Sequence, residues 1–463
     1  MSGPSRRSVL SALAVAAVAP LTACPGDPSP GPSSSPSAAP SSSPSPSQLP
    51  FGLVTPSTVE SVIFDGAFGT GYVEFAADIM KASYPGVRVR VTAVEDVRAA
   101  VEPRLADGAT PPDLVDNSGA ALLPVATLAD RFVELDDVVE SPSLEGEVLR
   151  ETLYHDVLAA GTFNGRLLAI NYALSVYGLW HSASEFAAQG WELPQTWDAI
   201  LALGDAARRL GRSLFVWGDE AADYYQELAI ASAVKEGGDE VRVALDNLAE
   251  DAWAHPAVKG VLEQLETCVR EGFVLRGGDY LTAQAAWVRE GAGLLYPAGA
   301  WIASEMSEVA PADFAMTVAP VPTLTAAPTL PISAVHASPT EQFLVPRDGR
   351  NVAGAKELLR TMLSRETAAH FSRTHLVPTI VRESVPADLE STALTSQARL
   401  LADAGEHVFS WRFVTHYGLG PETNAAWAEF LGGTLSAQGL AEQLQAISDR
   451  VRNDPDVERY TVE

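Results

Sequence analysis

Two spacings of apolar side chains alternate along the first globular part of the chain. Residues 61–64, 87–94 and 113–116 carry the short apolar or alternating patterns that are typical of β-strands. Residues 72–83 and 97–105 instead repeat apolar side chains every three or four positions, which predicts helices. The resulting order of strand, helix, strand, helix and strand indicates an α/β protein with a parallel sheet covered by helices.

Helical spacing dominates the rest of the chain, with short strands between the helices. The clearest amphipathic pattern covers residues 352–371 and places Val352, Ala355 and Leu358 on one face. Further helices are predicted at residues 196–210, 223–235, 256–272 and 280–290, and strands at residues 293–296 and 314–319.

The first 50 residues have a different composition and predict an export signal followed by a tether. Residues 9–23 are apolar but too few to span a bilayer, which takes about 20 residues. With Arg6 and Arg7 before them and Cys24 after them, they resemble a bacterial lipoprotein signal. Residues 25–50 are almost all Pro, Ser, Gly or Ala and cannot bury a core. We therefore expect lipidation at Cys24 and a lipid-anchored protein on the outer face of the cytoplasmic membrane.

The arginine pair leaves the export route open. Residues 5–10 also resemble the twin-arginine signal, which exports folded proteins. An ordinary secretory signal that carries two arginines fits the same residues equally well.

Length and charge limit the architecture and the partners. The chain has 463 residues and a formal net charge of −28. About 410 residues remain after the head and tether, more than one core usually supports, so we expect two lobes. The negative charge argues against nucleic acid and anionic lipid surfaces as partners. We expect a monomer.

The sequence contains no motif that indicates catalysis, a metal or a cofactor. If Cys24 is lipidated, Cys268 has no disulfide partner, and it lies in the apolar pattern of a predicted helix. His-Glu-x-x-His, Cys-x-x-Cys and Gly-x-Ser-x-Gly are all absent. A glycosidase needs only two suitably spaced carboxylates, and the chain has 59 acidic residues. A secreted glycoside hydrolase and a carbohydrate-binding adhesion lipoprotein therefore remain as alternatives.

Several blocks, taken in order, resemble the extracellular solute-binding proteins of sugar ABC transporters. The clearest is Gly-Trp-Glu-Leu-Pro-Gln-Thr-Trp-Asp at residues 190–198, which is similar to that family's G-x-x-x-P-x-T-W-D/E turn and helix start. The other blocks are residues 84–89, 164–170, 179–181, 355–368 and 376–378. The resemblance implies two α/β lobes joined by crossing segments, with a ligand cleft between them and permease subunits as partners.

A narrower resemblance covers residues 284–306. Gln284 and Trp287, followed by the run from Tyr296 to Met306, resemble the Q-x-x-W … P-C-G-S-W-L-x-N-E block of binding proteins for N-acetylglucosamine and N,N′-diacetylchitobiose. Trp301 and Glu305 match this block, whereas the positions of its Cys, Ser and Asn differ. The resemblance implies N-acetylglucosamine, short chito-oligosaccharides or a related neutral sugar as the ligand.

A sugar needs aromatic rings for its C–H face and polar side chains for its hydroxyls. We predict that Trp301 is a stacking platform and that Glu305, one helical turn later, accepts hydrogen bonds from the sugar. Asp116 and Asn117 follow the third strand, at the sheet edge where open α/β sheets bind ligands. The structural alternatives are a core tryptophan, a surface carboxylate and a helix cap.

Four more aromatic residues are candidates for the same site. Phe68 lies in a glycine-bearing loop, Trp217 ends an apolar strand, and Tyr224 begins a helix. Trp411 belongs to a late aromatic cluster that could also be a packed hinge. We expect some of these rings to face the cleft and the others to lie in the core.

These patterns predict a substrate-binding lipoprotein of an ABC sugar importer rather than an enzyme. The predicted divisions are a signal peptide at 1–23, the lipidated cysteine and tether at 24–57, a first lobe at 58–165 and 292–345, and a second lobe at 166–291 and 346–463.

Overall fold

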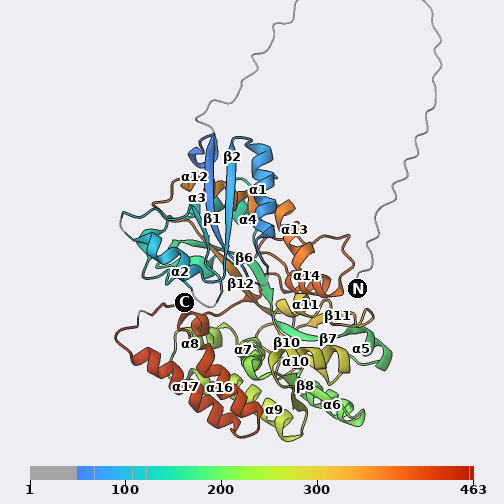
Figure 1. Cartoon of the computed structure of the whole chain (residues 1–463). Coiled ribbons are helices and arrows are strands. Elements are labelled where there is room, and N and C mark those ends of the chain that lie inside the picture. The colour runs from blue at the N-terminus through green and yellow to red at the C-terminus, as the bar shows by residue number, and fades with distance from the viewer. Residues whose placement is uncertain (1–48, 67, 107, 120–121, 458, 463) are drawn as a thin grey trace, which may run out of the picture. The chain divides into compact units, whose positions relative to one another are not determined.

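The computed structural model describes residues 49–462, apart from residues 67, 107, 120, 121 and 458 (Figure 1). The predicted signal peptide, Cys24 and most of the tether lie outside the described residues. Within the described part, no helix combines the length and the apolar character that a bilayer span requires.

The first of two large sheets has the strand order β13-β12-β3-β1-β2, with β6 also paired to β12. Its strands are β1 (Ser57–Phe64), β2 (Val87–Val94), β3 (Leu114–Asp116), β6 (Ala169–Val176), β12 (Val335–Leu344) and β13 (Val408–Phe409). β1 runs parallel to β2 and β3, whereas β12 runs antiparallel to β3 and β6. The predicted parallel β-α-β-α-β opening is therefore confirmed.

Helices cover this sheet, and β2 forms one of its edges beside β1 (Figure 1). The helices are α1 (Gly71–Ser83), α2 (Val97–Val101), α3 (Asp136–Val139), α4 (Leu149–Thr152), α12 (Val352–Met362) and α13 (Arg365–His375). α1 buries Tyr72, Val73, Ala76 and Met80, the face that its apolar spacing predicted.

Two predicted helices are each divided in the structure. The segment 97–105 becomes α2 followed by a short 3₁₀ helix at Glu102–Leu105, where Pro103 lacks the backbone N–H of a regular helix. The segment 352–371 becomes α12 and α13, because the Ser364 hydroxyl accepts from the Thr367 N–H and starts a new helix.

The second sheet has the order β11-β7-β10-β8-β9. Its strands are β7 (Gly178–Ser182), β8 (Ser213–Trp217), β9 (Val274–Arg276), β10 (Gly293–Ala298) and β11 (Met316–Ala319). Its flanking helices are α5 (Ala183–Gln189), α6 (Trp197–Arg209), α7 (Tyr224–Gly237), α8 (Asp239–Asp246), α9 (Pro256–Arg270), α10 (Tyr280–Ala285) and α11 (Trp301–Glu305). The turn before α6 forms as predicted: Gly190 adopts a φ of 67° and Thr196 caps α6.

The chain after α13 returns past the first sheet to the second lobe. It contains α14 (Thr392–Ala404), α15 (Phe413–His416), α16 (Gly420–Leu431) and α17 (Ala437–Asn453). α14 packs on β11, whereas α16 and α17 pack on each other and on α9.

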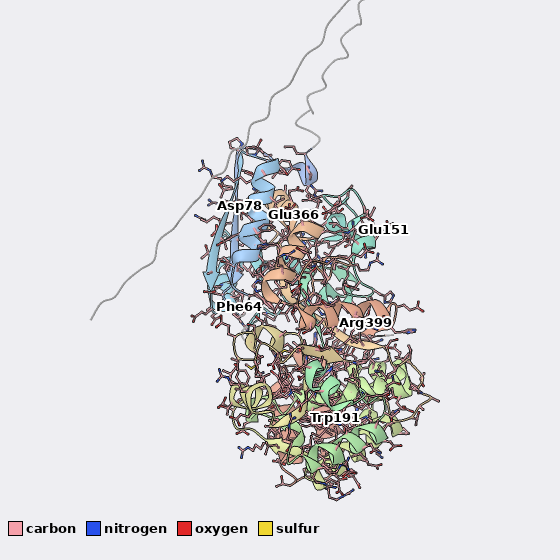
Figure 2. All side chains as sticks on the ribbon, turned by 90° about the vertical axis from the view of Figure 1, so that its right-hand side faces the viewer. Phe64, Asp78, Glu151, Trp191, Glu366 and Arg399 are labelled. Carbon is pink, nitrogen blue, oxygen red and sulfur yellow. The ribbon has the colours of Figure 1, made fainter. Side chains whose placement is uncertain are left out.

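The two sheets are joined by few residues, which gives a two-lobed fold. Tyr177 alone separates β6 of the first sheet from β7 of the second. In Figure 1, β6 and β12 descend together from the upper lobe towards β7. Figure 2 shows Phe64, at the end of β1, on the part of the first lobe that faces the second.

The strand pairing differs from the lobe boundaries expected from sequence. β6 and β13 lie within residues 166–291 and 346–463, which we expected in the second lobe, but they pair in the first sheet. β10 and β11 lie within residues 292–345, which we expected in the first lobe, but they pair in the second sheet. α12 and α13 lie within residues 346–463, which we expected in the second lobe, but they pack on α1 of the first. The expected boundaries were wrong for these segments because strands that are adjacent in a sheet come from distant parts of the chain.

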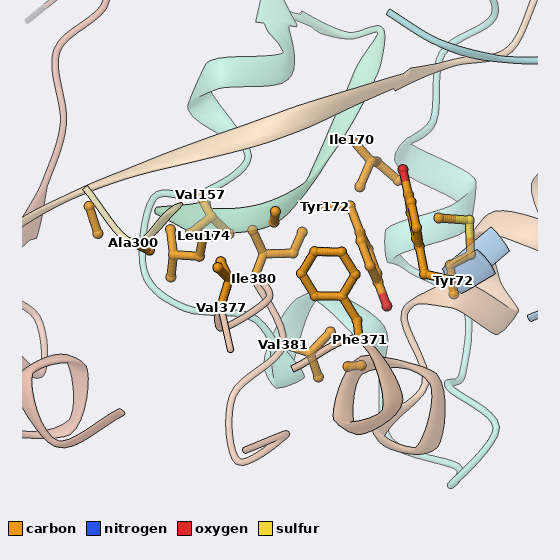
Figure 3. Close-up of a cluster of buried hydrophobic side chains, with 14 of the residues drawn as sticks. Tyr72, Val157, Ile170, Tyr172, Leu174, Ala300, Phe371, Val377, Ile380 and Val381 are labelled. Atoms are coloured by element: carbon orange, nitrogen blue, oxygen red, sulfur yellow. The ribbon is translucent and has the colours of Figure 1, made fainter. Parts of the chain in front are cut away.

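The first-lobe core has an aromatic centre. Figure 3 shows Tyr72, Tyr172 and Phe371 among aliphatic side chains from β6 and the segment 377–381. The rings of Tyr72 and Tyr172 are stacked at 5.8 Å, and Phe371 meets each of them edge-on at 5.3 Å. This packing holds α1 and α13 against β6 of the first sheet.

Candidate functional site

Trp301 and Tyr224, both predicted as ligand contacts, meet in the second lobe. Trp301 begins α11 directly after β10, and Tyr224 is the first residue of α7. The indole Nε1 of Trp301 donates to the Tyr224 hydroxyl at 3.1 Å, and the ring centroids are 5.4 Å apart. Both side chains are only partly buried. The pair can therefore present an aromatic surface whose orientation is fixed by a hydrogen bond.

Gly299 determines where the Trp301 ring lies. A Cβ atom on Gly299 would lie 2.0 Å from the nearest atom of that ring. The ring folds back over the backbone two residues earlier, and only glycine leaves this space.

We expect Gly299→Ala to displace the Trp301 ring and to weaken ligand binding about tenfold, the scale of losing a well-placed aromatic contact. Titration calorimetry measures the affinity, and tryptophan fluorescence reports the ring environment. Gly420→Ala is the matched control, because a Cβ there meets nothing within 4 Å. Equal affinities of the two variants would contradict the proposed packing.

A stack of rings continues from Trp301 through the segments that join the lobes. Tyr177 meets Trp301 edge-on at 5.4 Å and stacks on His336 at 4.5 Å. His336 in turn stacks on Trp411 at 3.7 Å with 13° between the planes. The predicted Trp411 thus belongs to the same array as Trp301, but it is 7% exposed. Its packing fits the hinge alternative as well as a ligand contact.

His336 is held on both ring nitrogens. Nδ1 lies 3.1 Å from the Phe409 carbonyl oxygen, and Nε2 lies 3.1 Å from a Glu227 carboxylate oxygen. Burial and the nearby Glu227 raise the pKa of Asp223 to about 7. Tyr177, Tyr224, Glu227 and Ala298 line a crevice that is too narrow for a water molecule.

Glu305 lies near Gln284 and Tyr296 on neighbouring elements. Burial raises the pKa of Glu305, and the Gln284 side chain partly offsets this shift. Burial also raises the pKa of Tyr296, followed by the influence of Tyr224 and Glu305. These groups therefore form one electrostatic cluster beside the Trp301–Tyr224 pair.

Asp116 and Asn117 lie at the end of β3, as predicted, but their side chains are occupied by the protein. The Asp116 carboxylate is fully buried and accepts from the Tyr72 hydroxyl at 3.1 Å and the Ser118 hydroxyl at 2.5 Å. The Asn117 amide bonds the Leu123 backbone and the Gln342 side chain. Both residues shape the loop after β3, and their ligand contact stays a prediction.

Glu341 faces the same loop from β12 and has an unusual backbone. Its φ is 57°, a left-handed value within a strand. Burial, and then the Asp116 carboxylate, raise the pKa of Glu341, while burial raises the pKa of Asp116. The two acids therefore hold protons in the folded chain at a pH where they are ionised in the unfolded chain.

Because both shifts are upward, the free energy of unfolding should fall as the pH rises above about 4, the ordinary range of these acids. Glu341→Gln should flatten this dependence and raise the stability at pH 8. Denaturant titrations at pH 5 and pH 8 measure both quantities. The exposed Glu192→Gln is the control, and an unchanged slope in Glu341→Gln would contradict the assignment.

Phe68 and Trp217 pack within the lobes. Phe68 contacts Phe371 at 5.1 Å and His375 at 5.2 Å in the first lobe. Trp217 is 4% exposed and lies in the second-lobe core, with the Arg276 guanidinium 5.9 Å from its ring. These contacts favour the packing alternative for both residues, and their ligand contact stays a prediction.

Phe64 is a partly exposed ring at the lobe junction that sequence reasoning missed. A Cβ on Gly66 would lie 2.0 Å from this ring, and one on Gly119 would lie 2.6 Å from it. The ring is therefore held between two glycines from separate loops. The sequence shows both glycines, but it does not show that the same Phe64 ring contacts each of them.

A cavity of about 600 Å³ lies between the loop 156–165 and the late segments 412–416 and 459–461. Arg412 spans it, donating to the carbonyls of Ala159 at 3.0 Å and Thr162 at 3.4 Å. Its guanidinium also lies 4.4 Å from the Tyr460 ring centroid. No pattern in the sequence predicted this cavity. In the described ranges, no three His, Cys, Asp or Glu side chains are grouped to hold a metal ion.

Comparison with known proteins identifies the family. The bacterial extracellular solute-binding protein family matches residues 66–369. The chain belongs to this family. It is also 46% identical to the diacetylchitobiose binding protein NgcE of Streptomyces coelicolor over 417 residues, 89% of each chain.

Solved structures show the same fold at low sequence identity. A chitin oligosaccharide binding protein has a TM-score of 0.64 and 17% identity, covering 86% of this chain and 99% of its own. The apo form of RafE from Streptococcus pneumoniae has a TM-score of 0.67 and 17% identity, covering 85% and 98%. A probable secreted solute-binding lipoprotein from Streptomyces coelicolor has a TM-score of 0.68 and 17% identity, covering 85% and 98%. The two-lobed fold expected from the sequence is confirmed.

Proposed function

We propose that this solute-binding protein captures N,N′-diacetylchitobiose or a related short chito-oligosaccharide and delivers it to the permease of an ABC importer. The half-buried Trp301, oriented by Tyr224 beside a carboxylate, carries the proposal, because rings and acceptors of this kind suit a sugar's two surfaces. The 46% identity to a diacetylchitobiose binding protein supports the choice of sugar. N-acetylglucosamine itself is the smallest ligand of this class.

Capture would involve closure of the lobes about the crossing segments. The two sheets are joined through Tyr177, through residues 320–334 between β11 and β12, and through residues 410–412 between β13 and α15. Crossing segments of this kind are suited to a hinge. The rings of Tyr177, His336 and Trp411 lie beside this hinge, and Tyr177 also contacts Trp301. A movement of the lobes would therefore act on the residues that contact the ligand.

Titration calorimetry of the chain without its signal and tether tests the ligand. We expect saturable binding of N,N′-diacetylchitobiose, with much weaker binding of maltose and xylobiose. Product analysis after long incubation should detect no cleavage. Preference for maltose or xylobiose would overturn the sugar assignment, and release of monosaccharide would favour a hydrolase.

The proposal places the protein on the outer face of the cytoplasmic membrane, anchored by lipid at Cys24. Mass spectrometry of the mature N-terminus should find diacylglycerol on this cysteine. One acyl chain binds a membrane only marginally, so two chains are expected. An unmodified N-terminus at another residue would contradict the anchor. Uptake of labelled sugar by cells that lack the protein tests delivery.

A further inference from the structure

Three neighbouring side chains carry buried polar atoms without hydrogen-bond partners. In the described part of the chain, these atoms are both amide atoms of Gln284, the Tyr296 hydroxyl and the Glu305 Oε2. Gln284 is 0% exposed and Tyr296 is 1% exposed. The three side chains come from α10, β10 and α11. A shift of one of these elements alone would therefore not give all of the atoms hydrogen-bond partners.

The three side chains lie close together. Gln284 lowers the pKa of Glu305, so the two are neighbours, although their geometry does not make a hydrogen bond. Burial raises the pKa of the Tyr296 hydroxyl, and the charges of Tyr224 and Glu305 raise it further. The Trp287 ring packs on the Tyr296 ring at 5.4 Å with 33° between the planes. We call Gln284, Tyr296 and Glu305 the polar nest.

Buried polar groups in native proteins are almost always paired with protein, water or ligand. An isolated exception can be tolerated, as at Tyr172, whose hydroxyl also lacks a partner in the first-lobe core. Four unpaired atoms in one place indicate a missing partner that offers both a donor and an acceptor.

The chemistry of the nest matches a secondary amide. An acetamido group presents one N–H donor, one carbonyl acceptor and a methyl group. Glu305 supplies an acceptor for the N–H, and the Tyr296 hydroxyl and the Gln284 amide nitrogen supply donors for the carbonyl. The partly buried Trp301 ring offers apolar surface for the methyl group.

We propose that Gln284, Tyr296 and Glu305 recognise the acetamido group of an N-acetylated amino sugar whose ring lies on Trp301. The inference rests on the proposed function and adds to it the residues that distinguish acetylated from plain sugars. A site built to pair an amide rejects an analogue that leaves its buried groups unpaired. Glu305 then acts as part of a three-residue site.

The test compares N,N′-diacetylchitobiose with cellobiose, which carries hydroxyls where the former carries acetamido groups. The ratio of their dissociation constants is measured by calorimetry for the wild type, Gln284→Leu and Tyr296→Phe. We expect each substitution to reduce the wild-type preference by about tenfold or more. Both remove unpaired polar atoms and keep the side-chain bulk, so the melting temperature should be unchanged or higher.

Tyr172→Phe is the matched control, because it removes an equally buried, unpaired hydroxyl in the other lobe. It should leave the preference unchanged. If the wild type prefers the acetylated sugar and both Gln284→Leu and Tyr296→Phe keep that preference, the inference is overturned and the proposed function stands. Wild-type protein that binds neither sugar, or prefers cellobiose, would overturn both. A crystal structure of the complex with only water in the nest would overturn the inference alone.

Discussion

Replacing Trp301 by alanine should weaken N,N′-diacetylchitobiose binding by well over tenfold, the scale expected for truncating a central aromatic contact. The change removes the ring that faces Tyr177 and Tyr224 and frees the Tyr224 hydroxyl from its indole donor. Titration calorimetry gives the affinity directly. The loss should appear mainly as faster dissociation in stopped-flow measurements, because the encounter of protein and sugar is unchanged.

Trp301→Phe separates stacking from hydrogen bonding. This variant keeps a ring but lacks the Nε1 donor to Tyr224. We expect an affinity between those of the wild type and Trp301→Ala. Wild-type affinity in Trp301→Ala would reject the platform role and would move the ligand towards the 600 Å³ cavity beside Arg412.

Replacing His336 by alanine should lower the free energy of unfolding by about 3 kcal/mol, the scale of truncating a large buried side chain. His336 is 2–3% exposed and stacks on Tyr177 and Trp411 at once. Its removal also takes away the partner of the Glu227 carboxylate and of the Phe409 carbonyl. Chemical denaturation followed by circular dichroism measures the change.

The exposed His155 provides the control for this experiment. His155→Ala should stay within about 0.5 kcal/mol of the wild type, as surface substitutions usually do. Because His336 lies on β12 at the crossing between lobes, His336→Ala should also weaken sugar binding. A stability loss as small as that of His155→Ala would show that the stack contributes little.

Local patterns predicted most of the elements, because each depends on the spacing of apolar side chains within one segment. Residues 87–94 form β2 as predicted, and the predicted helix 72–83 lies in α1 at Gly71–Ser83. The errors occur where a local signal interrupts the period: Pro103 ends α2 and Ser364 starts α13. Residues 286–290 form a π-helix after α10, which apolar periodicity did not predict.

The candidate site was predicted less completely. Trp301, Glu305 and Tyr224 were named from sequence and lie together in the second lobe. Tyr177 and His336 were missed, because a lone aromatic residue beside a strand carries no signal of what it stacks against. Phe68 was named for its loop position and Trp217 for its place at the end of a strand, but the structure packs them into the two lobes.

The sequence by itself determined the α/β class, the two-lobed fold and the family, and it predicted the export head, since all of these depend on composition, apolar period and short motifs. Only the tertiary structure decided which rings form one array and which buried polar groups lack partners. Residues 177, 224, 301, 336 and 411 are far apart in the chain and meet because strands of two sheets cross at one place. Such convergence depends on long-range pairing, which no local pattern encodes.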